Sequence, residues 1–446
     1  MQRSFARIAA VTSTLLLSVS ACGSAENSGG GDAADGGDDV KQVNVYGSDG
    51  NMGNALGEKF TEPGSLVNMR GTTPLTELTA EFTDRLLQLD PELIDFNYSA
   101  ESYDGVILAA LAAETARSSD AGDFTPFVNG LTSGGEVCTD FAACLALVQA
   151  GGDVDLNGVS GPLAFTDAGE PAAASYGILS FGEDNTIDEA ATDYVLGGDP
   201  ANASTQEPPA APAYAVPPAG APLVVGTLLP LTGNLAFLGP PMSAGANLAI
   251  SDINDAGGVL GQPVTLIETD SGDTSTDTAN GAVDRMLQDG VDVILGAASS
   301  GVSKTVIDKI TGSGVMQLSP SNTSDEFTTY NDNNLYFRTA PPDVLQARAL
   351  ADVILDDGNT SVSIIALNDP YGTGLSNNLR ENLISSGLDE EQVPEVIIYD
   401  PAATSYRTEV SEIADFNPDA VVVIGFDESS KILEEMNAQG IGPAAA

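Results

Sequence analysis

The sequence contains no histidine and no tryptophan, and only three of its 446 residues are cysteines. Without histidine, the chain cannot build a Ser-His-Asp or Cys-His catalytic site, and it offers no imidazole to a metal. The two cysteines beyond the N-terminal region are too few ligands for a zinc site. We therefore expect no enzyme activity, no metal and no cofactor.

Basic residues are also scarce, with 15 Lys and Arg against 64 Asp and Glu, and the formal net charge is -49. Binding to nucleic acid phosphates needs clusters of Lys and Arg, so nucleic acid is excluded as a natural partner. The excess of acidic residues indicates a well-solvated surface and points to no particular function.

The N-terminal residues are typical of an exported protein. The basic stretch Met1–Arg7 precedes the apolar segment Ile8–Leu17, which is too short to span a bilayer as a permanent helix. The motif Val-Ser-Ala-Cys, which ends at Cys22, resembles the lipobox of bacterial lipoproteins. This resemblance implies that residues 1–22 are a lipoprotein signal peptide and lipobox, with acylation at Cys22. The alternative is an ordinary secretory signal.

Residues 23–42 are rich in Gly, Ala, Asp and Ser and show no apolar period, so we expect a disordered tether there. The remaining cysteines, Cys138 and Cys144, lie well beyond it. In an exported protein, two cysteines so close in sequence favour a local disulfide loop.

Short apolar runs alternate with amphipathic stretches over most of the chain. The runs are β-branched and continuously apolar, which is typical of strands buried in a parallel sheet. We predict strands at Val43–Tyr46, Leu66–Met69, Pro162–Phe165, Ser175–Phe181, Val224–Leu229, Val264–Glu268, Val291–Leu295, Val315–Leu318, Val362–Leu367, Val396–Tyr399 and Ala420–Ile424. We predict helices at Asn51–Phe60, Tyr103–Ala116, Phe141–Ala150, Ala244–Ala256, Asp277–Asp289, Leu345–Leu355 and Leu375–Ile384. The alternation indicates a doubly wound α/β architecture, in which ligands bind at the carboxyl ends of strands.

A segment dense in proline and alanine, residues 198–221, separates an upstream region from a downstream region that begins at Pro222. This composition predicts a semi-rigid linker with polyproline character.

The downstream region carries six short motifs, each at a predicted strand end or helix start. They are Leu231–Gly239, Asp252–Gly258, Gly296–Gly301, Leu318–Thr323, Phe337–Ala340 and Asn368–Gly374. In this order they resemble the N-terminal two-thirds of type I periplasmic binding proteins. The resemblance is strongest to the branched-chain amino acid (leucine/isoleucine/valine) binding family of ABC importers.

The upstream region, residues 43–197, resembles the C-terminal third of the same family through Gly47–Asn54, Asn97–Asp104 and Ser160–Gly169. The two pieces therefore stand in exchanged order without duplication, which suggests a circular permutation. The predicted strand Val43–Tyr46 has no preceding helix, and the predicted helix that ends at Gly440 has no following strand, so each supplies what the other lacks. A chimeric gene model and swapping between molecules are the alternative explanations.

The resemblance implies an α/β fold of two doubly wound, Rossmann-like lobes, joined by a three-crossover hinge and circularly permuted. Residues 222–341 would form lobe 1, and residues 342–446 would form lobe 2, completed by residues 43–72. The rest of the upstream region would contribute to both lobes.

The resemblance also implies a site for a free amino acid between the lobes. Ser300 and Thr323 match family positions that contact the ligand carboxylate, and Ser299, Ser321 and Asn322 lie in the same two loops. Hydroxyls at a helix N-terminus suit an anion because the helix dipole favours negative charge there. N-capping alone is the simpler reading of the two adjacent serines.

Four further residues match the family positions around the rest of the ligand. Asp49 and Tyr371 would face the ammonium group, and Leu238 and Phe426 would line the side-chain pocket. Taken by itself, Asp49 is also a good turn residue, since it stands between Ser48 and Gly50.

We therefore expect an extracytoplasmic, monomeric lipoprotein, held at the cell membrane through Cys22, that captures an amino acid by closure of its lobes. The family resemblance implies a branched-chain ligand and delivery to an ABC permease with its ATPase subunits. The alternatives are a ligand-sensing subunit of a receptor or chemotaxis system, and a binder of a related amide or small aromatic acid.

Overall fold

The computed structural model describes residues 42–214 and 221–444. The predicted signal peptide, Cys22 and nearly all of the predicted tether lie outside the described residues. In the part of the chain that is described, no helix is both long and apolar enough to cross a membrane.

One parallel sheet has the strand order β12-β11-β10-β8-β9. Its strands are β8 (Val224–Leu229), β9 (Thr265–Asp270), β10 (Val293–Gly296), β11 (Met316–Ser319) and β12 (Tyr336–Arg338). Helices α6 (Gly239–Asp255) and α3 (Ser99–Ala116) pack on one face, and α7 (Thr278–Asp289) and α8 (Ser300–Gly312) pack on the other. We call this part lobe 1.

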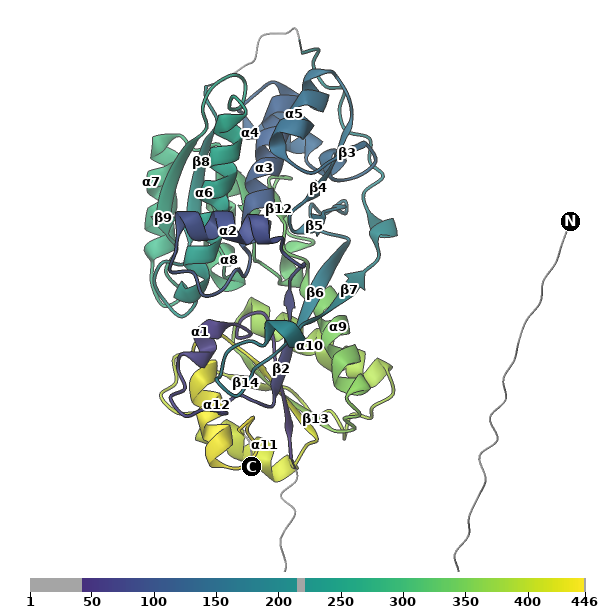
Figure 1. The fold of residues 1–446 in the computed structure, drawn as a ribbon, viewed down its shortest axis with the longest axis vertical. Helices are drawn as coiled ribbons and strands as arrows, with labels where there is room; N and C mark the ends of the chain where they lie inside the picture. Colours follow the sequence, from purple (N-terminus) through teal and green to yellow (C-terminus); the bar gives the residue numbers. More distant parts are fainter. Residues whose placement is uncertain (1–41, 215–220, 445–446) are drawn as a thin grey trace, which may run out of the picture. The chain divides into compact units, whose positions relative to one another are not determined.

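The second large sheet has the order β14-β13-β15-β1-β2-β6-β7. Its strands are β1 (Asn44–Gly47), β2 (Met69–Pro74), β6 (Ala173–Ser180), β7 (Asp193–Gly198), β13 (Val362–Leu367), β14 (Ile397–Tyr399) and β15 (Ala420–Ile424). Its helices are α1 (Asn54–Gly57), α9 (Asp343–Asp356), α10 (Pro370–Ser385), α11 (Arg407–Phe416) and α12 (Ser429–Ala438). We call this part lobe 2; Figure 1 shows it below lobe 1.

Segments from opposite ends of the sequence meet in lobe 2. Strand β1 lies between β15 and β2, all three parallel, and Asn44 pairs with Ala420. The Asn68 N–H donates to the Pro443 carbonyl at 3.1 Å, directly before β2. The upstream region therefore completes a sheet begun by the downstream region, and Pro443 lies in the same lobe as Val43.

The chain passes between the lobes three times. It leaves β2 for α2 (Ala80–Leu89), which packs on α6 in lobe 1. It returns from β5 (Gly161–Pro162) to β6, and it passes from β12 to α9 through residues 339–342. Figure 1 shows these segments between the two sheets. The predicted three-crossover hinge corresponds to these connections.

A small sheet of β3 (Glu136–Cys138), β4 (Val154–Gly158) and β5 lies beside lobe 1, with the short helices α4 (Ala121–Phe124) and α5 (Phe141–Gln149). Cys138 and Cys144 are joined by a disulfide, which links β3 to the first turn of α5. This is the pairing expected from the sequence.

Two predicted strands are wrong in extent. Of the predicted strand Leu66–Met69, only Met69 belongs to a strand. Leu66 lies in a turn in which the Met69 N–H donates to the Leu66 carbonyl, and the side chain of Leu66 is buried from this turn. The run Pro162–Phe165 is a strand only at Pro162, since Ala164 has a φ of 40° and breaks the extended backbone.

Helix boundaries also differ from the prediction. The helix expected at Asn51–Phe60 is reduced to α1, since the preceding loop wraps around the end of β1. Helices α6 and α10 begin earlier than predicted because proline occupies their first turns, where its missing N–H costs nothing.

In the predicted linker, Gly198 still belongs to β7, and Pro200–Asn202 form a short 3-10 turn. Residues 203–214 have no regular structure, and residues 215–220 lie outside the described part.

Candidate functional site

A cavity lies between the lobes, at the carboxyl ends of their strands. Residues of both lobes and of the segment before α3 line it: Asp49, Gly50, Tyr98, Leu235, Leu238, Ala298, Ser299, Ser300, Ser321, Thr323, Tyr371 and Phe426. The structure thus brings together all of the predicted site residues except Asn322.

The wall formed by lobe 1 begins at the end of β10. Ser299 is the N-cap of α8, and its hydroxyl accepts a hydrogen bond from the Val302 N–H at 3.3 Å. Ser300 is the first residue of this helix and is 3% exposed. The positive end of the α8 dipole therefore faces the cavity, and both predicted serines stand there.

The loop after β11 forms the rest of this wall. Ser321 and Thr323 line the cavity, as the sequence predicted. Asn322 does not, because its amide group donates to the Ala298 carbonyl at 2.7 Å and accepts from the Tyr336 hydroxyl at 3.0 Å. Asn322 is fully buried behind the loop and fixes Ala298, which itself lines the cavity.

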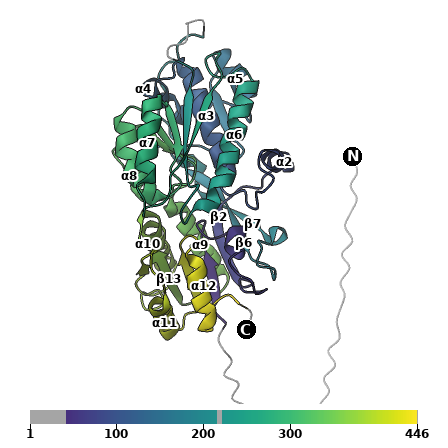
Figure 2. The ribbon, with the colours of Figure 1, turned by 90° about the vertical axis from the view of Figure 1, so that its left-hand side faces the viewer.

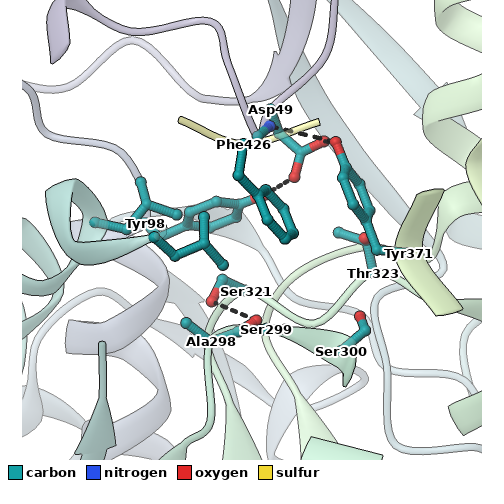
Figure 3. Close-up of a pocket in the computed structure, with 12 residues that line it drawn as sticks. Asp49, Tyr98, Ala298, Ser299, Ser300, Ser321, Thr323, Tyr371 and Phe426 are labelled. Atoms are coloured by element: carbon teal, nitrogen blue, oxygen red, sulfur yellow. Dashed lines mark hydrogen bonds between the residues drawn. The ribbon is translucent and has the colours of Figure 1, made fainter. Parts of the chain in front are cut away.

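The wall formed by lobe 2 is built around Asp49, in the turn after β1. Its Oδ1 accepts from the Tyr371 hydroxyl at 2.8 Å, and its Oδ2 accepts from the Tyr98 hydroxyl at 2.7 Å (Figure 3). The Phe426 ring stacks on Tyr371 with centroids 5.4 Å apart. Tyr371 belongs to the first turn of α10, and Phe426 follows β15.

Burial raises the pKa of Asp49, while the hydrogen bonds from Tyr98 and Tyr371 act in the opposite direction. The side chain is 5% exposed, and the residues lining this part of the described structure include no Lys or Arg. A buried carboxylate without a cation is costly, so the cavity favours a ligand that brings its own positive charge.

A second carboxyl group lies behind the cavity. Asp343, at the start of α9, is fully buried, and its backbone N–H donates to the Thr323 carbonyl at 2.7 Å. Burial raises its pKa well above the ordinary value, and the charge of Asp49 acts in the same direction.

Sequence reasoning missed Tyr98, whose hydroxyl holds Asp49. It stands directly before α3 with a φ of 60°, a left-handed conformation that is uncommon for a tyrosine. The motif from Asn97 to Asp104 was read as the start of a helix, and nothing in that motif marks the tyrosine as facing a carboxylate some 50 residues upstream. Leu235, Ala298 and Gly50 were also missed.

Direct contacts join the two lobes across the mouth of the cavity. The Asp427 N–H donates to the Asn234 carbonyl at 3.3 Å, and the Asn378 amide donates to the Asp325 carboxylate. The structure therefore describes a closed arrangement of the lobes.

A fold of two α/β lobes, three connections and a closed cavity defines a class of two-lobed binding proteins. The sequence profile of the periplasmic binding protein family matches residues 222–445, half of the chain. The chain belongs to the periplasmic binding protein family, which confirms the resemblance seen in the six motifs.

Two curated relatives show the extent of the similarity. The Leu/Ile/Val-binding protein homolog 3 of Brucella melitensis is 30% identical over 170 residues, which is 38% of this chain and 45% of that protein. The Leu/Ile/Val-binding protein BraC3 of Rhizobium johnstonii is 31% identical over 176 residues, or 39% of this chain and 47% of that protein. The chain thus spans about half the length of the curated relatives it matches.

Solved structures give partial matches. The leucine-binding protein LivK of Thermotoga maritima is 23% identical with a TM-score of 0.40, covering 45% of this chain and 55% of that one. LivJ of Streptococcus pneumoniae, in complex with isoleucine, is 23% identical with a TM-score of 0.43, covering 50% of this chain and 62% of that one.

Proposed function

We propose that the protein binds a free amino acid with an apolar side chain in the closed cavity between its lobes. The observation that carries this proposal is the charge arrangement of the cavity. Hydroxyls and a helix N-terminus stand on the wall of lobe 1, and a buried carboxylate without a lining cation stands on the wall of lobe 2. A zwitterion placed between them satisfies both walls.

The carboxylate of the ligand would lie against the N-terminus of α8. Ser300 and Thr323 would donate their hydroxyls, and the positive end of the α8 dipole would add to the favourable field. Ser299 and Ser321 would complete this half of the site.

The ammonium group would lie against Asp49. Tyr98 and Tyr371 already orient both carboxylate oxygens, so the acceptor is fixed before the ligand arrives. Such preorganisation lowers the entropy lost on binding.

The side chain of the ligand would contact the apolar part of the lining: Leu235, Leu238 and Phe426. The curated relatives are Leu/Ile/Val-binding proteins by name, which makes leucine, isoleucine and valine the first candidates.

By the same relationship we propose that the protein acts outside the cytoplasm, delivering its ligand to an ABC permease. The lipobox ending at Cys22 supports attachment to the cell membrane. Capture would work by a shift between open and closed lobes, with no bond made or broken.

We also propose that the order of the two pieces is a circular permutation of the family order. Two observations support it: the family profile covers only residues 222–445, and the upstream strands β1, β2 and β6 complete the sheet of lobe 2. Helix α3, also upstream, covers one face of the sheet of lobe 1.

Calorimetric titration with leucine, isoleucine and valine tests the proposed ligand. Two analogues serve as controls: 4-methylpentanoate lacks the ammonium group of leucine, and 3-methylbutylamine lacks its carboxylate. Loss of the ammonium group leaves the Asp49 carboxylate unsatisfied, and loss of the carboxylate leaves the hydroxyls and the α8 N-terminus without their anion, so we expect each analogue to bind at least about tenfold more weakly than leucine. Equal binding of 4-methylpentanoate and leucine would refute the assignment of Asp49 to the ammonium group.

A further inference from the structure

A second cavity lies in the hinge itself. It is lined by residues of all three connections between the lobes, as follows: Pro74 and Thr76 from the first, Leu163, Ala164, Pro171 and Ala173 from the second, and Thr339 and Pro341 from the third. Its residues are separate from those that line the amino acid cavity.

One carboxyl group stands in this apolar surrounding. Glu101, in the first turn of α3, lines the hinge cavity and is 7% exposed. Its backbone carbonyl accepts from the Thr339 hydroxyl at 2.8 Å, which fixes the residue against the third connection. Within the described structure, the carboxyl group of Glu101 accepts a hydrogen bond only from the backbone N–H of Glu101, and no side chain donates to it.

The charges around Glu101 are few. Among the described residues that line the hinge cavity, Glu101 alone is titratable. Asp104, one turn further along α3, adds a like charge, although it is itself held by the N–H groups of Val159 and Ser160. No basic side chain lines the cavity in the described structure, so a positive charge would have to come from a ligand.

We propose that the hinge cavity is a second binding site, which takes a small organic cation with a short apolar body, such as an alkylammonium ion. The ammonium group would pair with the Glu101 carboxylate, and the alkyl chain would contact the proline, leucine and alanine side chains of the walls. This proposal does not depend on the nature of the ligand between the lobes.

Binding in the hinge cavity should affect closure of the lobes, because the cavity lies in the hinge. Its walls are the three segments that must change conformation when the lobes open. A cation that binds more tightly to the closed hinge would favour closure, and the ligand between the lobes would favour cation binding by the same factor.

Binding should also release a proton. Burial raises the pKa of Glu101 to about 8, so the empty cavity holds a neutral carboxyl group below that pH. Because only the carboxylate pairs with an ammonium ion, apparent affinity should rise about tenfold per pH unit up to about pH 8 and then level off.

Titration of the full protein with n-butylammonium tests the proposal, with 1-butanol as a neutral probe of nearly the same shape. The titration is done with the cavity between the lobes saturated with amino acid, and it is repeated in Asp49→Asn. These two conditions distinguish binding of the cation at Asp49 from binding at Glu101. We expect saturable binding of n-butylammonium in both cases, with a rise in affinity from pH 6 to pH 8 and little binding of 1-butanol.

Two variants separate the hinge site from a structural effect. Glu101→Gln should lose at least about tenfold in affinity for n-butylammonium and should lose the pH dependence. Ala174→Leu places a larger apolar side chain in the lining of the cavity and leaves Glu101 in place, and it should weaken the binding of n-butylammonium. The exposed Glu183→Gln is the matched control and should bind as the parent does.

Absence of saturable binding by the parent protein would overturn the proposal. So would binding that survives in Glu101→Gln, or binding that is lost equally in Glu183→Gln. Failure of leucine to bind in the separate titration would overturn only the proposed function of the other cavity.

Discussion

At the scale of single residues, the site depends on one carboxylate held by two tyrosines. Asp49 comes from the upstream region of the chain, Tyr98 precedes α3, and Tyr371 belongs to the downstream region. These three hydrogen-bonding groups, far apart in sequence, form the part of the cavity that can recognise a cation.

Replacement of Asp49 by asparagine tests its assigned role. The variant keeps the shape but loses the negative charge, so we expect amino acid affinity to fall roughly tenfold to a hundredfold. Calorimetric titration with the preferred amino acid measures the change. The exposed Glu391→Gln removes one negative charge from the same lobe and should bind normally; equal losses in both variants would indicate a general charge effect.

Replacement of Tyr98 by phenylalanine tests the residue that the sequence did not reveal. It removes the donor to Asp49 Oδ2, which leaves a buried carboxylate oxygen without its partner. We expect a loss of about tenfold in amino acid affinity, with a cooperative unfolding transition retained. Tyr330→Phe serves as the control, because the Tyr330 hydroxyl donates to the exposed Asp308. Unchanged amino acid affinity in Tyr98→Phe would contradict the role of Tyr98 in holding Asp49.

At the scale of elements, most strands of both large sheets follow the predicted pattern, because continuous β-branched runs bury both faces of a parallel strand. The misplaced elements have local causes. Ala164 adopts a left-handed conformation, and Leu66 reaches the core from a turn. Local sequence shows that such residues are apolar, but it does not show which backbone conformation carries them inward.

The disulfide belongs to this scale, since it fixes the short connection between β3 and α5. Replacing both Cys138 and Cys144 by serine should lower the free energy of unfolding by about 2 kcal/mol, because the unfolded chain regains the entropy of a short loop. Denaturant unfolding measures the loss. No described residue of the small sheet lines the amino acid cavity, so ligand affinity should change less than about twofold.

At the scale of the whole molecule, acid should stabilise the folded state. Burial raises the pKa of Asp104 and Asp369 to about 6 and that of Glu101 to about 8. A carboxyl group with a raised pKa contributes stability below its unfolded value, and this contribution is lost as the pH rises through the folded value.

We therefore expect the free energy of unfolding to fall between about pH 4 and pH 8, by up to about 1.4 kcal/mol per pH unit for each group between its unfolded and its folded pKa. All three groups contribute up to about pH 6, and Glu101 alone contributes above it. Denaturant unfolding at several pH values measures the slope. High salt screens the repulsion that follows from the net charge of -49, so a slope that vanishes in high salt would assign the effect to the surface. Exposed carboxyls whose pKa is lowered, such as Asp184 beside the Thr186 hydroxyl, titrate below this window.

The order of the two pieces is also a property of the whole molecule. A rearranged chain, in which residues 222–446 come first and residues 42–199 follow, should fold and bind the same amino acid within about threefold. The reason is that the Pro443 carbonyl accepts from Asn68 beside β1, so the new junction is short. Thermal unfolding and titration measure the result; a rearranged chain that folds but does not bind would contradict the permutation.

The sequence by itself determined the α/β alternation, the family and most of the residues around the cavity between the lobes. Short-range signals carry all of these: apolar period, Gly and Ser at strand ends, and motifs in family order. Only the tertiary structure decided that β1 lies between β15 and β2 and that Glu101 lines a hinge cavity. It also decided that the Asn322 amide donates to the Ala298 carbonyl and that the Tyr98 hydroxyl donates to Asp49. Each of these depends on contacts between distant segments, because burial and hydrogen bonding are settled only when the sheets and connections close around a side chain.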